Sequence, residues 1–326
     1  MRAVSRMLGN ARVAAGVLFC AFLASGCALV IPQTMELHDA WPAGLPGHAE
    51  LTDVAFLPQD EYQCGPSALA TTLNYAGVKI TPDDLVPQVY LPARHGSLQV
   101  EMLAAPRKHG IVSYKLAGRF EDVLREVAAG NPVIVLQDFG IWPVSIWHYS
   151  VVAGYDQSSG KVIVRSGTDP RPPMPFAVLE YIWKESDYWA MVTPPPGRIP
   201  ATATEAEYGD AVAAMARVGD ARSAKIAYAA FMRRWPENLR GFIGLANSHY
   251  ALGELNDAES VLRQVSERYP DSVPVLNNLA QTLSDQGRNE EALAVIDRAL
   301  AIPGPFNSAA GETRATILQR IGRAQR

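Results

Sequence analysis

Cys64 lies where a nucleophile could act. It directly precedes Gly65 and Pro66 in QDEYQCGPSAL, and the pattern CGPSALATTLNYA predicts a helix over residues 64–76. Proline suits the first turn of a helix, and Gly77 suits the left-handed residue that ends one. Because a helix N-terminus stabilises negative charge, we expect the pKa of the Cys64 thiol to be lowered. Gly65 leaves room beside the sulfur for a carbonyl group to approach.

A nucleophilic cysteine needs a base, and His148 is the best candidate among the six histidines. It opens the segment HYSVVAGYD, which is typical of a buried strand, and a strand end can hold a ring rigidly against a helix N-terminus. The remaining histidines fall in segments that suit a catalytic base less well, and these are His38, His48, His95, His109 and His249. A structural histidine and a buried, inert cysteine are the alternative interpretation.

The first 26 residues resemble a bacterial lipoprotein signal peptide. Three arginines precede an uncharged apolar run over residues 13–24, which is too short to span a bilayer. The residues ASGC that follow resemble a lipobox, so we expect cleavage before Cys27 and attachment of a lipid to it. An ordinary secretory signal is the alternative. Ala28, in place of an aspartate, then favours the outer membrane, with the protein facing the periplasm.

We expect a different chemical state for each of the three cysteines. Cys20 would leave with the signal peptide, and Cys27 would carry the lipid. Cys64 would then be the one free thiol in an oxidising compartment. A thiol there is open to oxidation, which suggests that this one is kept for a function.

Charge and motifs argue against several function classes. The net charge of −4 becomes −7 when the three arginines of the signal peptide leave, and an acidic chain does not favour nucleic acid. Membrane attachment would therefore depend on lipid chains. The sequence has no glycine-rich phosphate loop, no paired-histidine metal spacing and no Cys-x-x-Cys. We expect neither a cofactor nor a metal.

The pattern of the first half predicts an α+β domain. After a tether over residues 27–50, helical and strand patterns alternate through residues 51–193. Glycines close two further predicted helices, and β-branched runs predict strands. The predicted helices cover residues 99–109 and 120–129, and the predicted strands cover 132–137, 149–155, 161–165 and 188–193. Helices come first and strands later, which is typical of the α+β class.

A Pro-rich linker over residues 194–204 separates this domain from a repeat region. Gly219, Gly253 and Gly287 lie 34 residues apart, and alanines, prolines and leucines keep the same step. This period resembles the tetratricopeptide repeat, in which each unit is a pair of antiparallel helices. We expect an all-α solenoid over residues 205–326, made of three units and a capping helix, with a groove that binds a protein partner.

Residues 51–193 resemble the papain-like cysteine peptidases that process bacteriocin leaders at double-glycine sites. The resemblance is carried by QDEYQCGPSALA, AAGNPVIVL and HYSVVAGYD. It implies that Cys64 is the nucleophile and His148 the base. Gln59, five residues before the cysteine, would be the oxyanion-hole donor. Those relatives are fused to a transporter, and no corresponding segment is found here.

The sequence does not decide which residue is the third member of the catalytic site. The family orients its histidine with an aspartate in an Asp-Pro pair, which implies Asp169, 21 residues after His148. Ser166 lies nearer to the expected spacing, and Asp156 at the predicted hairpin turn is a poorer candidate. An aspartate would fix the ring tautomer and stabilise the imidazolium, whereas a serine would do so weakly.

These observations predict a lipid-anchored periplasmic cysteine peptidase that acts on a peptide or protein. The repeats would recruit its substrate or a partner. A non-catalytic scaffold that binds peptides is one alternative. A Cys-His cell-wall amidase is another, although such enzymes usually carry Asp-Cys-Ser-Gly at the nucleophile, not Gln-Cys-Gly-Pro.

Overall fold

The computed structural model describes residues 31–57, 63–141, 143–166 and 172–325. The expected signal peptide, Cys27, Gln59 and Asp169 lie outside the described residues. The chain forms two compact units, one of residues 1–102 and 115–192, the other of residues 103–114 and 193–326. Among the described residues, no helix has both the length and the apolar character that a bilayer crossing requires.

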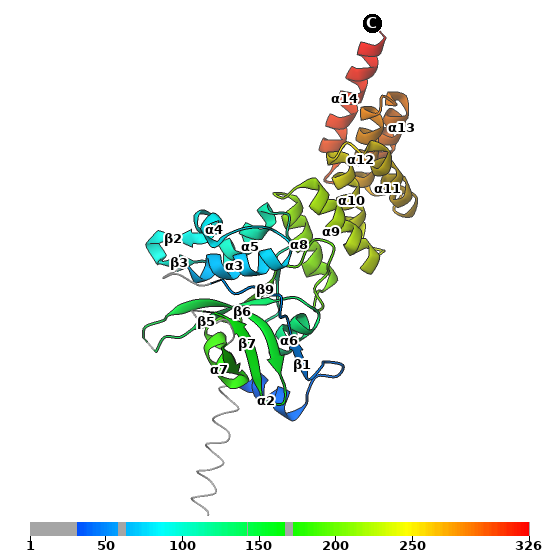
Figure 1. Ribbon diagram of the computed structural model, residues 1–326. Helices are drawn as coiled ribbons and strands as arrows, with labels where there is room; N and C mark the ends of the chain where they lie inside the picture. Colours follow the sequence, from blue (N-terminus) through cyan, green and yellow to red (C-terminus); the bar gives the residue numbers. More distant parts are fainter. Residues whose placement is uncertain (1–30, 58–62, 142, 167–171, 326) are drawn as a thin grey trace, which may run out of the picture. The chain divides into compact units, whose positions relative to one another are not determined.

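An antiparallel sheet forms the centre of the first unit (Figure 1). Its strands run in the order β4-β9-β5-β6-β7-β8, and β1 pairs with the far end of the long strand β6. The side chains of β5 and most of β6 are buried, which is why these segments read as continuous apolar runs. The strands are β1 (His48–Glu50), β4 (Tyr114–Lys115), β5 (Val133–Asp138), β6 (Trp147–Asp156), β7 (Lys161–Arg165), β8 (Pro173–Pro175) and β9 (Ala190–Val192).

Helices and a small hairpin complete this half of the chain, and the helix over residues 99–108 begins in the first unit and ends in the second. Helix α3 is the most buried and packs on β6. Thr81 and Asp84 form a reciprocal capping box at the start of α4, with Pro82 as its first residue. The remaining elements are α2 (Pro32–Asp39), α3 (Cys64–Tyr75), α4 (Pro82–Val89), β2 (Tyr90–Leu91), η1 (Pro92–Arg94), β3 (Gly96–Ser97), α5 (Gln99–Lys108), α6 (Phe120–Ala128), α7 (Phe176–Trp183) and η2 (Lys184–Ser186).

The elements predicted from periodicity are confirmed to within two residues at each end. Helices α3, α5 and α6 and strands β5, β6, β7 and β9 occupy the predicted segments. The class is α+β, as expected, with an antiparallel sheet followed along the chain by a run of helices.

The prediction of a tether over residues 27–50 is wrong for the described part. Helix α2 and strand β1 lie there, and β1 pairs with β6 through His48 and Asp156. The buried carboxylate of Glu180 accepts hydrogen bonds from the backbone N–H groups of Gln33 and Thr34, at the start of α2. These partners are distant in sequence, so local periodicity could not reveal them.

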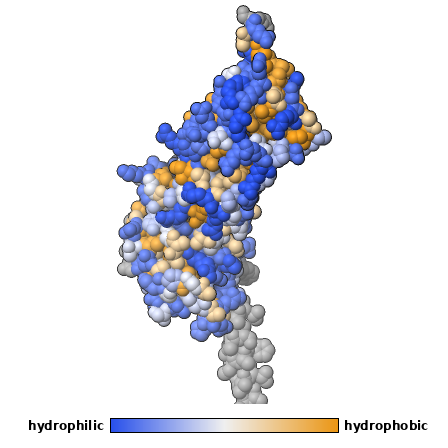
Figure 2. Space-filling view, turned by 90° about the vertical axis from the view of Figure 1, so that its right-hand side faces the viewer, coloured by the Kyte–Doolittle hydropathy of each residue, from blue (hydrophilic) through white to orange (hydrophobic). Residues whose placement is uncertain are grey.

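The second unit consists mainly of paired helices, as the 34-residue period predicts. The cap side chains of Thr204, Asp220 and Asn238 accept hydrogen bonds from backbone N–H groups at the starts of α8, α9 and α10. The helices are α8 (Glu205–Ala216), α9 (Ala221–Arg234), α10 (Leu239–Ala251), α11 (Leu255–Arg268), α12 (Val273–Asp285), α13 (Asn289–Leu300) and α14 (Asn307–Ala324). On the face drawn in Figure 2 these helices present a mostly hydrophilic surface, with hydrophobic residues gathered near α14.

Small residues allow the first repeat helices to approach closely. A Cβ atom added at Gly244 on α10 would overlap the ring of Tyr228 on α9. The ring therefore packs where a side chain would otherwise lie. The sequence gives no hint of this role, because Gly244 is not one of the glycines that repeat at 34 residues.

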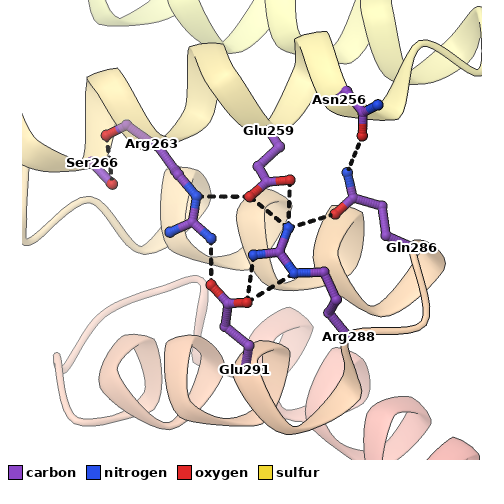
Figure 3. Close-up of polar contacts among 7 residues, drawn as sticks. All are labelled: Asn256, Glu259, Arg263, Ser266, Gln286, Arg288 and Glu291. Carbon is purple, nitrogen blue, oxygen red and sulfur yellow. Dashed lines mark hydrogen bonds and ion pairs between the residues drawn. The ribbon is translucent and has the colours of Figure 1, made fainter.

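Ion pairs join the last two repeat units (Figure 3). The carboxylate of Glu259 on α11 accepts hydrogen bonds from Arg263 at 2.8 Å and from Arg288 at 2.7 Å. Both arginines also pair with Glu291 on α13. Burial opposes ionisation of Glu259, but the arginine hydrogen bonds outweigh it and lower the pKa of Glu259 to about 2.

Residues 103–114 belong to the second compact unit although they lie inside the predicted peptidase domain. The hydroxyl of Tyr114 donates to the carboxylate of Glu207 at 2.9 Å. A Cβ added at Gly110 would collide with the side chain of Ser223. The division of the chain into domains at residue 193 therefore differs from the observed units.

Candidate active site

One cavity of the first unit contains both residues singled out for catalysis. It has a volume of about 1090 Å³, and Cys64 and His148 both line it. Cys64 is the first residue of α3, and His148 is the second residue of β6. The contact between α3 and β6 brings these two chain segments, 84 residues apart, to one cavity.

The local structure around Cys64 explains the glycine that follows it. Gly65 is buried, and a Cβ atom placed there would lie 2.7 Å from the Cβ of Ser97 on β3. The absence of a side chain therefore lets the β2–β3 hairpin pack against the first turn of α3. This contact, rather than access for a substrate alone, requires glycine at this position.

The expectation that the pKa of the Cys64 thiol is lowered overall is wrong, although the N–H groups at the start of α3 act in the expected direction. Burial raises the pKa, and hydrogen bonds from the backbone N–H groups of Tyr149, Gly65 and Cys64 offset it only in part. The thiol is half-buried, so the loss of water around the thiolate outweighs the helix terminus. The Tyr149 N–H also shows that the sulfur lies against the backbone immediately after His148.

His148 is held from two sides. Its Nε2 atom lies 2.7 Å from the hydroxyl of Ser166, just after β7. The ring of Phe139 contacts the imidazole edge-on, with centroids 5.6 Å apart. Burial lowers the pKa of His148, so the neutral ring is favoured near neutral pH.

The three candidates for the residue that orients His148 have different outcomes. Ser166 contacts the ring directly. Asp156 lies at the opposite end of β6, eight residues and roughly 26 Å along the strand, so it cannot serve. Its carboxylate accepts hydrogen bonds from Ser158 and Ser159. Asp169 lies outside the described residues, as does the proposed oxyanion donor Gln59.

Apolar side chains surround the cavity. Trp147 lines it and is 49% exposed. Leu98, Val100 and Ile146 line it as well and are exposed. Sequence reasoning missed the β2–β3 hairpin and its neighbours Leu98 and Val100, because strands of two residues are too short to show a period.

Ionisable groups share the cavity with Cys64 and His148. Arg94, His95, Glu185 and Asp187 line it. His95, which the sequence makes a less suitable catalytic base than His148, adopts a left-handed backbone conformation with φ of 48°. The cavity therefore offers both apolar and charged contacts to a bound chain.

The described residues contain one group with metal-ligand spacing, and it lies in the second unit. His249, Glu254 and Asp257 have atoms within 4.8 Å of one another. The ammonium group of Lys225 already contacts both oxygens of Glu254, at 2.7 and 2.8 Å. Because a cation already neutralises this carboxylate, the group is better described as an ion-pair cluster.

Comparison with known proteins identifies both parts of the chain. Residues 51–186 match the Peptidase_C39 like family, and residues 243–308 match the tetratricopeptide repeat. The chain thus joins a C39-like peptidase domain to tetratricopeptide repeats. This agrees with the resemblance in the sequence and with the α+β unit followed by paired helices.

Parts of the chain are similar to solved structures at low sequence identity. A C39-like peptidase from Bacillus anthracis is 20% identical, with a TM-score of 0.39 over 45% of this chain and 98% of that one. The peptidase domain of Streptococcus ComA, a bifunctional ABC transporter involved in quorum sensing, is 18% identical, with a TM-score of 0.35 over 43% and 98%. A structure of MamA is 22% identical, with a TM-score of 0.27 over 36% and 81%.

One curated protein shares a short segment. The PsbD mRNA maturation factor Nac2 of the Chlamydomonas reinhardtii chloroplast is 35% identical over 71 residues. That segment is 22% of this chain, and the chain spans only 5% of the length of Nac2.

Proposed function

We propose that this protein is a cysteine peptidase in which Cys64 attacks a peptide carbonyl and His148 transfers the proton. One observation carries the proposal. The thiol and the imidazole line one cavity, and the N–H of Tyr149, next to His148, bonds to the sulfur. The match of residues 51–186 to the Peptidase_C39 like family agrees with this chemistry.

The reaction begins with a neutral thiol and a neutral imidazole. His148 takes the thiol proton as the sulfur forms a bond to the carbonyl carbon, and the carbonyl oxygen becomes an oxyanion. The amide side chain of Gln59 is the proposed donor to that oxyanion, a contact whose removal costs about 3–4 kcal/mol in other enzymes. Collapse of the intermediate breaks the C–N bond, and His148 returns its proton to the leaving amine.

Hydrolysis of the acyl-enzyme completes the cycle. His148 accepts a proton from water as the water oxygen attacks the thioester carbon. The C–S bond then breaks, and the proton passes back from His148 to the sulfur. Each half of the reaction therefore uses the same two side chains, and no cofactor enters the balance.

The apolar rim supports a substrate with apolar side chains near the cleaved bond. Val100 and Ile146 are 62% and 59% exposed beside the cavity. Burying such side chains against a bound chain yields roughly 25 cal/mol per Å² of apolar surface removed from water. We infer that the enzyme cleaves peptides or unfolded segments rather than compact proteins.

The repeats are proposed to recruit the substrate or a partner protein. A second cavity, of about 240 Å³, lies among their first helices and is lined by Tyr228, Asn238, Arg240 and Asn247 among others. Amide, guanidinium and aromatic groups together suit the backbone and polar side chains of a bound peptide.

The proposed place of action is the periplasmic side of the outer membrane, with a lipid on Cys27. The test is metabolic labelling with an alkyne fatty acid, with Cys27→Ser as the control. Labelling that persists in Cys27→Ser would refute attachment at this residue.

Turnover of a peptide library tests the enzymatic proposal. We expect Cys64→Ala and His148→Ala to abolish cleavage, while Cys64→Ser, which keeps the shape, retains a trace at most. Matched activity in Cys64→Ala and the parent protein would exclude this site. Release of amino groups from purified peptidoglycan in the same assay would instead support an amidase.

A non-catalytic peptide-binding scaffold is the second candidate, and the raised pKa of Cys64 is the observation that favours it. In that case no peptide is cleaved, and Cys64→Ala binds peptides as the parent protein does.

A further inference from the structure

A hydroxyl group, not a carboxylate, contacts the far side of His148. The Oγ atom of Ser166 lies 2.7 Å from Nε2, and both residues are half-buried. Arg165 pairs with Val151, so Ser166 lies diagonally across from His148 on the neighbouring strand. Diagonal neighbours on adjacent strands are within reach of long side chains. The sheet register itself therefore holds Ser166 at the ring.

We propose that Ser166 is the positioning residue of this site: its hydroxyl accepts a hydrogen bond from Nε2–H and leaves Nδ1 free to exchange a proton with Cys64. The inference rests on the proposed function, in which Cys64 and His148 act together. A hydroxyl both donates and accepts, so it can follow the ring as the ring gains and loses its proton.

The side chain that contacts Nε2 affects the pKa values of His148 and Cys64 mainly through its charge. An ionised carboxylate at Nε2 would stabilise the imidazolium, and the imidazolium in turn would stabilise the Cys64 thiolate. A neutral hydroxyl supplies neither effect. Burial raises the pKa of Cys64 and lowers that of His148, and each shift favours the uncharged form of its side chain. The pair therefore rests uncharged, and the proton moves only as the sulfur attacks.

The other ionisable groups around His148 do not replace a carboxylate at Nε2. The cavity presents Arg94, His95, Tyr149, Glu185 and Asp187 besides Cys64. On the neighbouring strand β5, the carboxylate of Asp138 accepts hydrogen bonds from the N–H groups of Gly140 and Ile146. Within the part of the chain that the structure describes, Ser166 is the residue that hydrogen bonds to the His148 ring.

Four variants of the full-length chain test the inference: Ser166→Ala, Ser166→Asp, Ser166→Asn and Asp169→Asn. The first readout is the rate at which iodoacetamide alkylates Cys64, followed from pH 5 to 9 by mass spectrometry of the peptide that contains it. This readout requires no substrate. The second is kcat/KM for a peptide that the parent protein cleaves.

We expect Ser166→Ala to lower kcat/KM about tenfold, as the loss of one neutral hydrogen bond predicts. In Ser166→Asp, the alkylation midpoint falls by at least about one pH unit, because an anion beside the imidazole favours the ion pair. Ser166→Asn matches Ser166→Asp in shape but lacks its charge, so it should keep the alkylation midpoint of the parent protein. Asp169→Asn should change neither the alkylation rate nor kcat/KM by more than about twofold. Circular dichroism identifies any variant that fails to fold, and the NMR titration of His148 in the parent protein then decides: a pKa below the usual 6.5 supports the inference.

Two results would overturn it. One is a large loss in Asp169→Asn with none in Ser166→Ala, which would transfer the role to Asp169. The other is a parent His148 that titrates above its usual range. If the alkylation profiles behave as expected but no peptide is cleaved, the positioning role stands and the peptidase proposal alone fails.

Discussion

The ion pairs around Glu259 in the repeats allow a prediction whose size follows from the structure. The change is Glu259→Gln, which keeps the shape and removes the charge. The side chain is 14% exposed and accepts hydrogen bonds from Arg263 and Arg288. The substitution leaves both guanidinium groups without this carboxylate, between helices α11 and α13.

The magnitude follows from the lowered pKa. A pKa that falls from 4.5 to about 2 on folding corresponds to at most about 3.4 kcal/mol of stability at pH 7. Both arginines are 42% exposed, so solvent screens the pair, and we expect a loss of about 1–2 kcal/mol. Because the folded-state pKa is lowered, this stability is fully present above pH 4.5 and is lost as the pH falls toward 2.

Native-state hydrogen exchange of the α11 and α13 amides measures this loss locally. At pH 7 we expect these amides to exchange about 5–30 times faster in Glu259→Gln than in the parent protein. At pH 3 the ratio should shrink by roughly half on a free-energy scale. Glu267→Gln, at an exposed acid on the same helix, serves as the control and should exchange as the parent does. If these amides exchange at the parent rate in Glu259→Gln at both pH values, the arginines contribute nothing to the pKa of Glu259.

Three further predictions concern packing and the cavity. Gly244→Ala should destabilise the repeats by about 1–3 kcal/mol in denaturant titrations, because its Cβ would overlap the Tyr228 ring. Gly65→Ala should slow alkylation of Cys64 and lower the melting temperature, because its Cβ would lie 2.7 Å from that of Ser97. Val100→Ser should raise KM severalfold for substrates with apolar side chains and leave kcat nearly unchanged, as expected for a contact made equally in ground and transition states.

Each of these has a matched control. Gly311→Ala on α14 meets no neighbouring atom and should be neutral or stabilising. The double variant Gly65→Ala with Ser97→Gly should recover part of the alkylation rate. Val178→Ser changes an exposed valine that does not line the cavity, so an equal rise in KM there would contradict the assigned contact.

The sequence predicts where the helices and strands lie better than it predicts which residues pack around them. The helix that begins at Cys64 and the strand that begins near His148 follow from caps and periodicity, which are local properties. The pKa of Cys64 does not follow, because burial depends on what packs over α3. The same limit explains residues 32–50, whose order depends on distant partners such as Glu180.

The candidate site was partly accessible for the same reason. Residue types and spacing single out Cys64 and His148, which the fold brings to one cavity, and keep Ser166 among three candidates for the third residue. The contact between Ser166 and the His148 ring depends on the register of β6 and β7, which a one-residue slip would alter. Leu98 and Val100 escaped detection because only the folded β2–β3 hairpin brings them to the cavity.

The membership of residues 103–114 in the second unit has a practical consequence for any fragment made from this gene. In a fragment that stops at residue 193, Tyr114 would lose its hydrogen bond to Glu207 and Gly110 would lose its neighbour Ser223. The chain passes between the two units after residues 102, 114 and 192, so no single cut separates them cleanly. Repeats expressed from residue 193 onward would therefore lack residues 103–114 of their own unit.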